Sequence, residues 1–231
     1  MTLFNAKSPA KAFLFVSDFL LQNGIKRSGI IEILNGVIEF TDFEDGDFEN
    51  QFDKKFREIF EDERIDYASK VTFIEPTKNE NNEYQYETVK KGWKNSYWGR
   101  MIKYEDKFNQ FENVINILKK GKNIKRCNMQ IWHPSYDAKK MFGQPCLLSL
   151  DFKPRDKELF MSATFRSQRV SKSGYADYTA LTNLGKFIAK ECGLTLKSIC
   201  NIAHSLHLGN GDELKKTKLL LNEYFTQNKE S

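Results

Sequence analysis

The sequence has no uninterrupted run of about 18 apolar residues, so we expect no segment that spans a membrane. It also has no internal repeat, linker or low-complexity tract that would separate domains. The apolar start of the chain resembles a signal peptide only superficially, because it carries Asp18 and lacks a small-residue cleavage site. We therefore expect one cytoplasmic domain that comprises residues 1–231.

The cysteines and the charges form no pattern typical of a metal site or a nucleic-acid surface. The spacings of Cys127, Cys146, Cys192 and Cys200 fit neither a zinc site nor a disulfide framework. We expect no metal, and we expect the thiols to be reduced. The net charge of +5 arises from 36 basic and 31 acidic residues that are interspersed along the chain. Without a clustered basic and aromatic stripe, nucleic acid is not an expected partner.

Hydrophobic periodicity and capping signals predict a mixture of helices and strands. Ser8 and Pro9 suit the start of a helix, and Gly24 suits its end. Further helices are expected over residues 52–65, 108–123, 176–193 and 212–225. Strands are expected over residues 126–132, 145–152, 159–167 and 194–208, with a hairpin around Asn35-Gly36 in residues 28–40. This order predicts an α+β fold, in which a mostly antiparallel or mixed sheet carries a long helix.

Five residues in the second half of the chain stand in an order that suggests a reactive site. Cys146 follows a proline at the start of a strand-like segment, and Arg166 and Ser167 end the next such segment. Asp177 comes at the start of the long helix, and His207 comes near the end of the last strand. Taken alone, Cys146 would be a small buried hydrophobe and Asp177 a helix-capping carboxylate. A thiol that shares a cleft with guanidinium groups is instead a candidate nucleophile.

The Pro-Cys pair, the Arg-Ser pair, the carboxylate and the histidine, in this order and at this spacing, resemble the thymidylate synthase superfamily. The resemblance runs from Gln144 to about His207 and more loosely back to Trp132. It is closest to the short archaeal-type members and to the cytidylate hydroxymethylases. It implies a three-layer thymidylate synthase-like fold, a pyrimidine nucleoside monophosphate as substrate and 5,10-methylenetetrahydrofolate as one-carbon donor. It also implies a homodimer whose subunits share the phosphate site.

The resemblance assigns roles to individual residues. Cys146 matches the nucleophile that adds to C6 of the pyrimidine ring, which makes C5 able to attack a one-carbon unit. His207 matches the histidine that binds the sugar hydroxyl. The residues expected to contact the phosphate are Arg166, Ser167, Arg27 and, donated across the dimer interface, Lys125 and Arg126. A phosphate that carries nearly two charges accounts for several cations at one place.

Other positions match the family more loosely. Glu58 is the candidate general acid/base, with Glu61 as a rival. Tyr97 and Arg100 resemble a segment that lines the same cleft, and Arg169, which replaces a family aspartate, is also expected to line it.

Asp177 indicates which base the site reads. Uracil-specific members of the superfamily carry an asparagine at this position, whose amide both donates and accepts. An ionised carboxylate only accepts, so it would repel O4 of uracil and accept from the exocyclic amine of cytosine. Buried polar groups left unpaired by the wrong base would provide the discrimination.

These observations predict a 5-hydroxymethylase of CMP or dCMP that uses methylenetetrahydrofolate and water. Gly209 stands where a sugar-binding tyrosine is usual, so we expect open space near the 2′ and 3′ positions, which favours a ribonucleotide. Two alternatives remain: a short thymidylate synthase that methylates dUMP, and a nucleotide-binding homologue without turnover.

Overall fold

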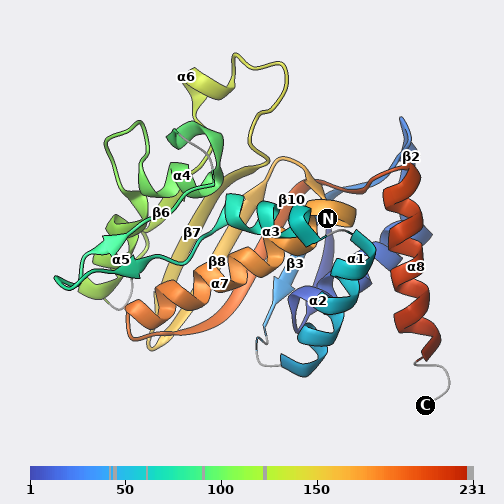
Figure 1. Ribbon diagram of the computed structural model, residues 1–231, viewed down its shortest axis with the longest axis horizontal. Coiled ribbons are helices and arrows are strands. Elements are labelled where there is room, and N and C mark those ends of the chain that lie inside the picture. The colour runs from blue at the N-terminus through green and yellow to red at the C-terminus, as the bar shows by residue number, and fades with distance from the viewer. Residues whose placement is uncertain (42, 44–45, 61, 90–91, 122–123, 228–231) are drawn as a thin grey trace.

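The computed structural model describes residues 1–41, 43, 46–60, 62–89, 92–121 and 124–227 (Figure 1). The helices are α1 (Pro9–Asn23), α2 (Gly46–Phe60), α3 (Asp62–Thr72), α4 (Tyr97–Ile102), α5 (Gln110–Lys120), α6 (Pro134–Asp137), α7 (Tyr175–Glu191) and α8 (Gly211–Gln227). The strands are β1 (Thr2–Ala6), β2 (Ile25–Arg27), β3 (Ile30–Phe40), β4 (Thr77–Lys78), β5 (Tyr84–Gln85), β6 (Asn128–Gln130), β7 (Leu147–Arg155), β8 (Glu158–Phe165), β9 (Gln168–Arg169) and β10 (Thr195–Leu208). In this part of the chain, no helix is both long and apolar enough to cross a membrane.

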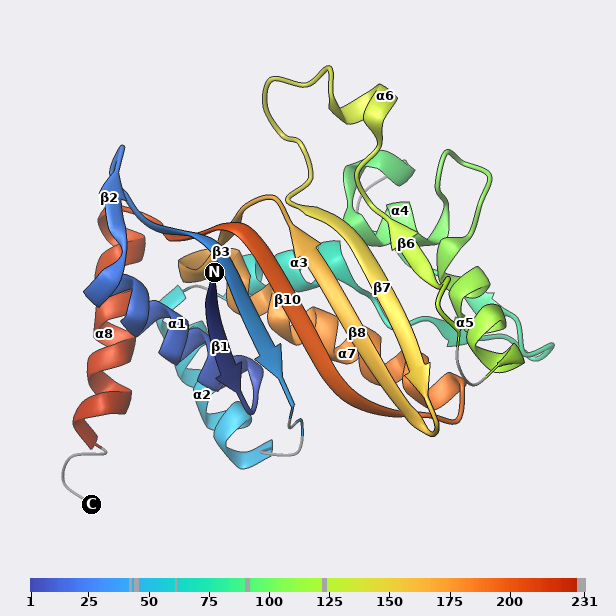
Figure 2. The same ribbon diagram turned by 180° about the vertical axis from the view of Figure 1, so that it is seen from behind.

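A mixed sheet forms the centre of the described chain, with its strands in the order β1-β3-β10-β8-β7-β6 (Figure 2). β10 runs antiparallel to β3 and parallel to β8, while β8, β7 and β6 form an antiparallel meander. Burial alternates along β8, where Leu159, Met161, Ala163 and Phe165 are buried and the residues between them are partly exposed. This period of two gives the sheet one face toward the helices and one more open face.

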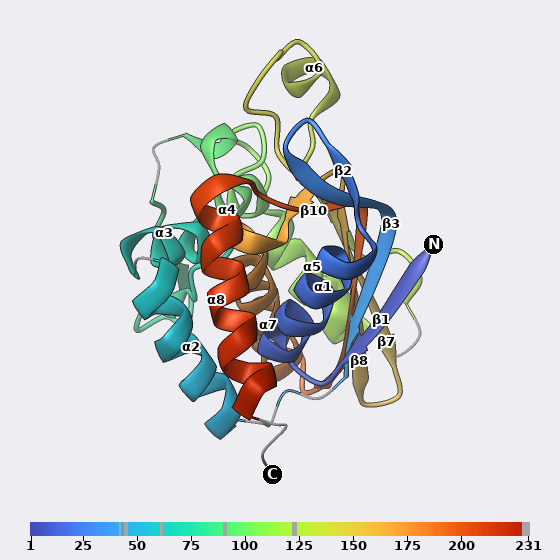
Figure 3. The ribbon, with the colours of Figure 1, turned by 90° about the vertical axis from the view of Figure 1, so that its right-hand side faces the viewer.

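Helices cover one face of the sheet in two layers (Figure 3). α1 and α7 pack directly on the strands, and α2, α3 and α8 pack outside them. Aromatic rings connect these layers: the ring centroids of Phe13 and Phe56 are 5.1 Å apart, and those of Phe56 and Tyr175 are 4.6 Å apart. Such edge and tilted contacts add to the burial of large apolar surfaces. The expected α+β fold, with a mixed sheet and a long helix packed on it, is confirmed.

The first helix is capped as its sequence predicts. Ser8 is the N-cap, its side chain accepts a hydrogen bond from the Lys11 backbone amide, and Gly24 follows the last residue. The predicted helix over residues 52–65 is wrong in its bounds, because α2 begins at Gly46 and a separate helix, α3, follows it.

The predicted hairpin around Asn35-Gly36 is also wrong. The two residues lie inside the single strand β3, and the turn is formed earlier by Ser28 and Gly29, with φ of 46° and 84°. Asn35 has a φ of 56° within the strand, so an Asn-Gly pair here marks a local irregularity and not a reversal of the chain. Gly36 is required by a close approach, since a Cβ would lie 2.7 Å from Cδ2 of Leu206.

We predict that Gly36→Ala lowers the free energy of unfolding by about 1–3 kcal/mol, because the added methyl group displaces Leu206 in the central strand. Urea denaturation would measure this change. Gly46→Ala is the matched control, because nothing lies within 4 Å of its Cβ position at the start of α2, and it should be neutral or slightly stabilising. Equal stability of the two variants would contradict the prediction.

Candidate active site

The expected site residues come together at one end of the central strands of the sheet. Leu147 at the start of β7 pairs with Phe165 at the end of β8, and Gln168 and Arg169 in β9 pair with Leu206 and His207 in β10. The residues just before β7 and just after β8 therefore lie beside the end of β10. The register of three strands, set by their hydrophobic alternation, positions the site.

A cavity of about 420 Å³ opens at this end of the strands. The expected residues that line it are Cys146, Arg166, Ser167, Asp177, His207, Tyr97 and Arg169. Tyr67, Ala68, Val71 and Thr72 of α3 form another part of its wall, together with Gln168 and Ser173. A concave site with an apolar wall and a few polar groups is typical of a small-molecule binding site.

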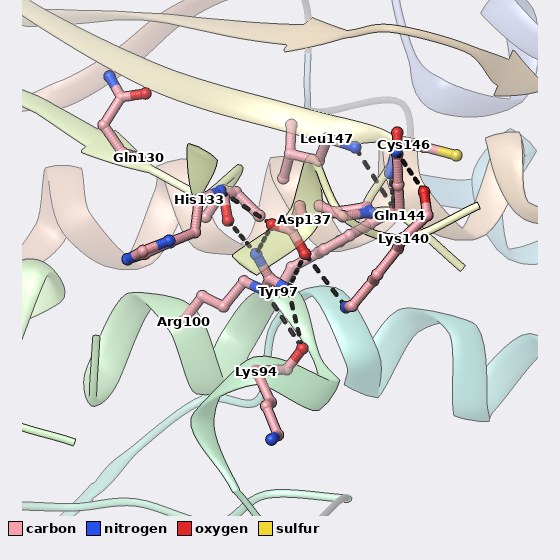
Figure 4. Close-up of polar contacts among 12 residues, drawn as sticks. Lys94, Tyr97, Arg100, Gln130, His133, Asp137, Lys140, Gln144, Cys146 and Leu147 are labelled. Carbon is pink, nitrogen blue, oxygen red and sulfur yellow. Dashed lines mark hydrogen bonds and ion pairs between the residues drawn. The ribbon is translucent and has the colours of Figure 1, made fainter. Parts of the chain in front are cut away.

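Cys146 is half-buried and is held by two neighbours. The Tyr97 hydroxyl accepts from the backbone N–H groups of Cys146, at 3.1 Å, and Leu147, at 3.4 Å (Figure 4). Arg166 Nε donates to the Pro145 carbonyl at 2.9 Å, and its Nη2 donates to the Gln144 carbonyl at 3.0 Å. Burial raises the pKa of the Cys146 thiol, and the Arg166 guanidinium opposes this by favouring the thiolate. Arg166 thus both fixes the chain around the thiol and favours its reactive form.

Asp177 lies in the first turn of α7 and is 6% exposed. Burial raises the pKa of its carboxyl group to about 7, although the neighbouring Thr72 hydroxyl and Gln168 amide favour the ionised form. Thr72 Oγ1 donates to Oδ1 of Asp177 at 3.1 Å. The carboxyl group therefore changes its charge near neutral pH inside a cavity that also contains a thiol.

His207 and Arg169 face the same cavity from neighbouring strands. Burial lowers the pKa of His207, and the charge of Arg169 lowers it further, so the imidazole is neutral at pH 7. Its Nδ1 is buried and has no hydrogen-bond partner within the described residues. Arg169 is exposed, and its Nη1 lies 3.4 Å from Oε1 of Glu213 in α8.

The space expected beside Gly209 is filled. A Cβ on Gly209 would lie 2.2 Å from Oε2 of Glu213 and 3.2 Å from Oγ of Ser171, and the Gly209 N–H donates to Ser171 Oγ at 2.8 Å. The expectation of open space here is wrong, and with it the argument for a ribonucleotide.

Some expected residues lie away from the cavity. Glu58 is exposed on α2, and its Oε2 lies 3.5 Å from Nζ of Lys55. The structure therefore does not bring Glu58 to the thiol. Glu61, its rival, is outside the described residues. Arg27 is the last residue of β2 and lies at the same end of the sheet, but it does not line the cavity.

Lys125 and Arg126 precede β6 near the opposite end of β7. The Lys125 carbonyl accepts from Lys153 Nζ at 2.9 Å, and Lys153 lies roughly 20 Å along the strand from Cys146. Within one subunit these two cations are therefore remote from the cavity.

Arg100 is a buried structural residue and not part of this cavity. It is 2% exposed, and its Nη2 donates to Oδ1 of Asp137 at 2.9 Å while Nη1 donates to Oδ2 at 2.5 Å (Figure 4). Nη1 also donates to the Ile131 carbonyl at 2.6 Å. The ion pair holds the start of the segment that leads to Cys146. Arg100 also lines a smaller cavity of about 170 Å³ beside Tyr97.

The sequence reasoning missed Thr72, Gln168 and Asn201, which surround or support Asp177. Asn201 is fully buried in β10 and donates to Gln168 Oε1 at 2.8 Å. An asparagine on the buried side of an otherwise apolar strand was the available signal. In the described part of the chain, no group of three or more His, Cys, Asp or Glu side chains is arranged to hold a metal ion.

We predict that Arg166→Met slows alkylation of Cys146 by iodoacetamide at pH 8 about three- to tenfold, because loss of the guanidinium raises the pKa of the thiol. Peptide mass spectrometry would follow Cys146 separately from the other cysteines. Arg155→Met, an exposed arginine at the far end of β7, is the control and should leave the rate unchanged. A rate unaffected by either substitution would show that Arg166 does not stabilise the thiolate.

Comparison with known proteins places these features in one family. The sequence profile described as thymidylate synthase matches residues 40–226. The chain is similar to a Methanococcoides burtonii protein named "Putative thymidylate synthase", with 29% identity over 125 residues, 54% of this chain and 57% of the relative. A Methanocaldococcus jannaschii protein of the same name is 28% identical over 119 residues, 48% of this chain and 54% of the relative.

A bacterial relative gives a shorter match. The Fusobacterium nucleatum protein named "Thymidylate synthase" is 30% identical over 99 residues, 43% of this chain and 36% of the relative. The chain thus spans little more than half the length of the archaeal relatives that it matches. The profile nevertheless covers most of the chain, including every residue that lines the cavity. The chain belongs to the thymidylate synthase family.

Proposed function

We propose that the protein is a pyrimidine nucleotide C5 one-carbon transferase and, within that class, a 5-hydroxymethylase of CMP or dCMP. One observation carries the finer assignment: a buried carboxylate, Asp177, faces the cavity that holds the Cys146 thiol. A nucleophile for C6 and an acceptor for the exocyclic amine of cytosine are thus available to a single bound base. Membership of the thymidylate synthase family supports the broader class.

Different residues of the cavity suit different parts of the nucleotide. Ionised Asp177 accepts from the cytosine amine and repels the O4 of uracil. The cations and hydroxyl at the cavity wall, Arg166, Arg169 and Ser167, suit the 5′-phosphate. His207, which lines the same cavity with a neutral ring, suits a sugar hydroxyl. The phosphate end and the base end of the ligand are thereby distinguished by charge.

The proposed reaction begins when the thiolate of Cys146 bonds to C6 of the base. The ring electrons then move to C5, which attacks the one-carbon unit, and the C5 proton is lost before the sulfur leaves C6. Overall, a hydroxymethyl group would replace the C5 hydrogen: water would supply its hydroxyl, and the donor would leave as tetrahydrofolate, which takes up the C5 proton and the second proton of the water. Arg166 supports the first step by stabilising the thiolate, and Tyr97 holds the backbone of the nucleophile.

The residues at the cavity wall fit a flat ring beside the base. Tyr67, Ala68 and Val71 of α3 provide an apolar surface opposite the polar strand ends. 5,10-methylenetetrahydrofolate, when bound there, supplies the one-carbon unit at the oxidation level of formaldehyde. Among the described residues that line the cavity, Asp177 is the only carboxylate, so no described glutamate accepts the C5 proton directly.

A second candidate is methylation of dUMP, as in a thymidylate synthase. The observation in its favour is the pKa of about 7 for Asp177, because a protonated carboxyl group donates to O4 and accepts from N3–H. Uracil would then bind mainly below pH 7. This gives the two candidate substrates opposite dependences on pH.

We predict that loss of the C5 hydrogen, followed by NMR in deuterated water, occurs with CMP or dCMP in preference to UMP or dUMP. With methylenetetrahydrofolate present, mass spectrometry should show a product heavier by a hydroxymethyl group. The preference for cytosine should rise as the pH increases through about 7, because ionised Asp177 rejects O4. Asp177→Asn should reverse the preference, by roughly 10- to 100-fold in kcat/KM, and remove its dependence on pH.

Cys146→Ser is the control for chemistry, and it should abolish hydrogen exchange while nucleotide binding persists. Exchange with dUMP alone would establish the methylating alternative. Binding of nucleotides by the wild type without any exchange would indicate a homologue that has lost turnover.

We also propose a homodimer formed through the open face of the sheet. The uncovered side of the strands is visible in Figure 3 and includes partly exposed apolar residues such as Val37 and Ile202, which pair in neighbouring strands. Because Lys125 and Arg126 are remote from the cavity of their own subunit, a phosphate role for them requires a second subunit.

We predict that Ile202→Lys produces a monomer in sedimentation velocity at micromolar concentration and weakens nucleotide binding at least tenfold. A charge at the centre of an apolar interface loses hydration without gaining a partner. Leu219→Lys, at a 59% exposed position on α8, is the control and should leave both properties unchanged. A monomeric wild type with full nucleotide affinity would contradict the shared phosphate site.

A further inference from the structure

A buried ion pair, formed by Arg100 and Asp137, has no part in the proposed chemistry (Figure 4). The two side chains are 2% and 0% exposed, respectively, and neither lines the cavity that holds the Cys146 thiol. Removing two charges from water costs free energy, and an apolar pair of similar volume often gives an equally stable or more stable fold. A charged pair at this place therefore calls for a role besides stability.

The guanidinium group of Arg100 joins three segments of the chain. It donates to both carboxylate oxygens of Asp137 in α6, to the Ile131 carbonyl after β6 and to the Lys94 carbonyl ahead of α4. The Trp93 ring lies against the guanidinium, with 5.6 Å between the ring centroid and Cζ of Arg100. The donors of a guanidinium group lie in one rigid plane, so it fixes several segments at once, which neither an ammonium group nor an apolar side chain can do.

One of these segments leads to the nucleophile. It begins in α6 at Asp137, where Arg100 holds it, and it runs to Cys146. At its far end, Arg166 Nε donates to the Pro145 carbonyl at 2.9 Å, and the Arg166 backbone N–H donates to the Cys146 carbonyl at 2.9 Å. The segment is therefore held at both ends, and the position of the thiol depends on both.

The helix that carries Arg100 also carries Tyr97, one turn earlier in α4. The Tyr97 hydroxyl accepts from the backbone N–H groups of Cys146, at 3.1 Å, and Leu147, at 3.4 Å. A helix of six residues is unstable by itself, so its position depends on tertiary contacts such as those of Arg100. Arg100 therefore links the helix that carries the Tyr97 hydroxyl to the segment that carries Cys146.

We propose that Arg100, through its ion pair with Asp137, is a positioning residue for the nucleophile. It holds α4 against the segment over residues 137–146, so that the Tyr97 hydroxyl stays within hydrogen-bond distance of the Cys146 backbone. Arg100 lies outside the lining of the cavity that holds the thiol, and it acts through Tyr97 and Asp137. This role rests on the proposed function, because Cys146 is a nucleophile only in that reaction.

The physical basis is the precision that attack on C6 demands. A nucleophile displaced by about 1 Å from its reactive position can lose a factor of about 100 in rate. Burial by itself would raise the pKa of Asp137, but hydrogen bonds from Arg100, Lys140 and a backbone amide lower it to about 2. Because an arginine also stays charged, the pair holds the segment at every pH at which a thiolate reacts.

The test compares two ways of removing the ion pair with the removal of its target. Arg100→Lys keeps the positive charge but loses the planar fork, and the double substitution Arg100→Met and Asp137→Leu leaves no unpaired charge in the interior. Tyr97→Phe removes the acceptor of the Cys146 N–H group. Phe152→Leu is the control, because it removes packing from a buried position further along β7 and leaves the ion pair intact.

Amide exchange and turnover are measured on each protein. Hydrogen exchange of the Cys146 N–H group, followed by NMR without any ligand, reports its bond to Tyr97. We expect both variants of the ion pair to speed this exchange at least about tenfold. With saturating CMP, they should lower kcat for loss of the C5 hydrogen roughly 10- to 100-fold. Kd for CMP from calorimetry should change less than about twofold, because the pair lies outside the cavity, and Phe152→Leu should change none of these values.

The combination of Arg100→Lys with Tyr97→Phe shows whether Arg100 acts through Tyr97. If it does, the combined variant exchanges the Cys146 amide hydrogen no faster than Tyr97→Phe alone. Effects that add overturn the proposal, and so does unchanged amide exchange in both variants of the ion pair. The same changes in Phe152→Leu also overturn it, because lost stability would then be the cause.

Faster amide exchange with an unchanged kcat overturns the positioning role and leaves the proposed function intact. A wild type that exchanges no C5 hydrogen with any pyrimidine nucleotide refutes the proposed function first and removes the positioning role with it. Because the amide measurement requires no ligand, the two failures are distinguished.

Discussion

The burial of one carboxyl group, that of Asp177, is the constraint on which the site depends. A carboxylate removed from water costs several kcal/mol unless donors replace its hydration. Here Thr72 at the end of α3 donates to Oδ1 of Asp177, and Gln168 in β9, which is held by Asn201 in β10, lines the same cavity. The end of the cavity that we propose reads the base therefore requires α3, α7 and the central strand to be packed correctly at the same time. Its specificity is linked to the stability of the fold.

Local sequence signals predicted much of the architecture. Ser8 and Gly24 bound α1 because capping is a property of a few adjacent residues, and the alternation in β8 is visible in any window of that length. The same local signals failed for Asn35-Gly36, since a positive φ suits both a hairpin turn and an irregular strand. The two are distinguished by the pairing of residues on both sides of Asn35-Gly36 with β10, a strand far apart in the sequence.

In the candidate site, too, some residues could be predicted from the sequence and others could not. The order of Cys146, Arg166, Asp177 and His207 along the chain indicated residues that the strand register does bring to one cavity. Arg100 and Glu58 could not be placed that way, because a helix motif does not reveal whether its side chain turns inward to an ion pair or outward to solvent. Arg100 forms a buried ion pair with Asp137, and Glu58 lies beside Lys55. The Gln168–Asn201 pair was hidden because it depends on how β9 is aligned with β10.

The two arginines of the cavity differ in what they are free to do, and this difference bears on catalysis. Arg166 donates to the carbonyls of Gln144 and Pro145, so moving its guanidinium would displace the chain that carries the thiol. Arg169 is exposed, and its contact with Glu213 at 3.4 Å is of a kind that contributes about 0–1 kcal/mol. A phosphate with nearly two charges would compete effectively with Glu213 for that cation. In the proposed nucleotide complex, one cation would thus stay fixed beside the thiol while the other adapts to the ligand, and binding of the phosphate need not disturb the geometry of the thiol.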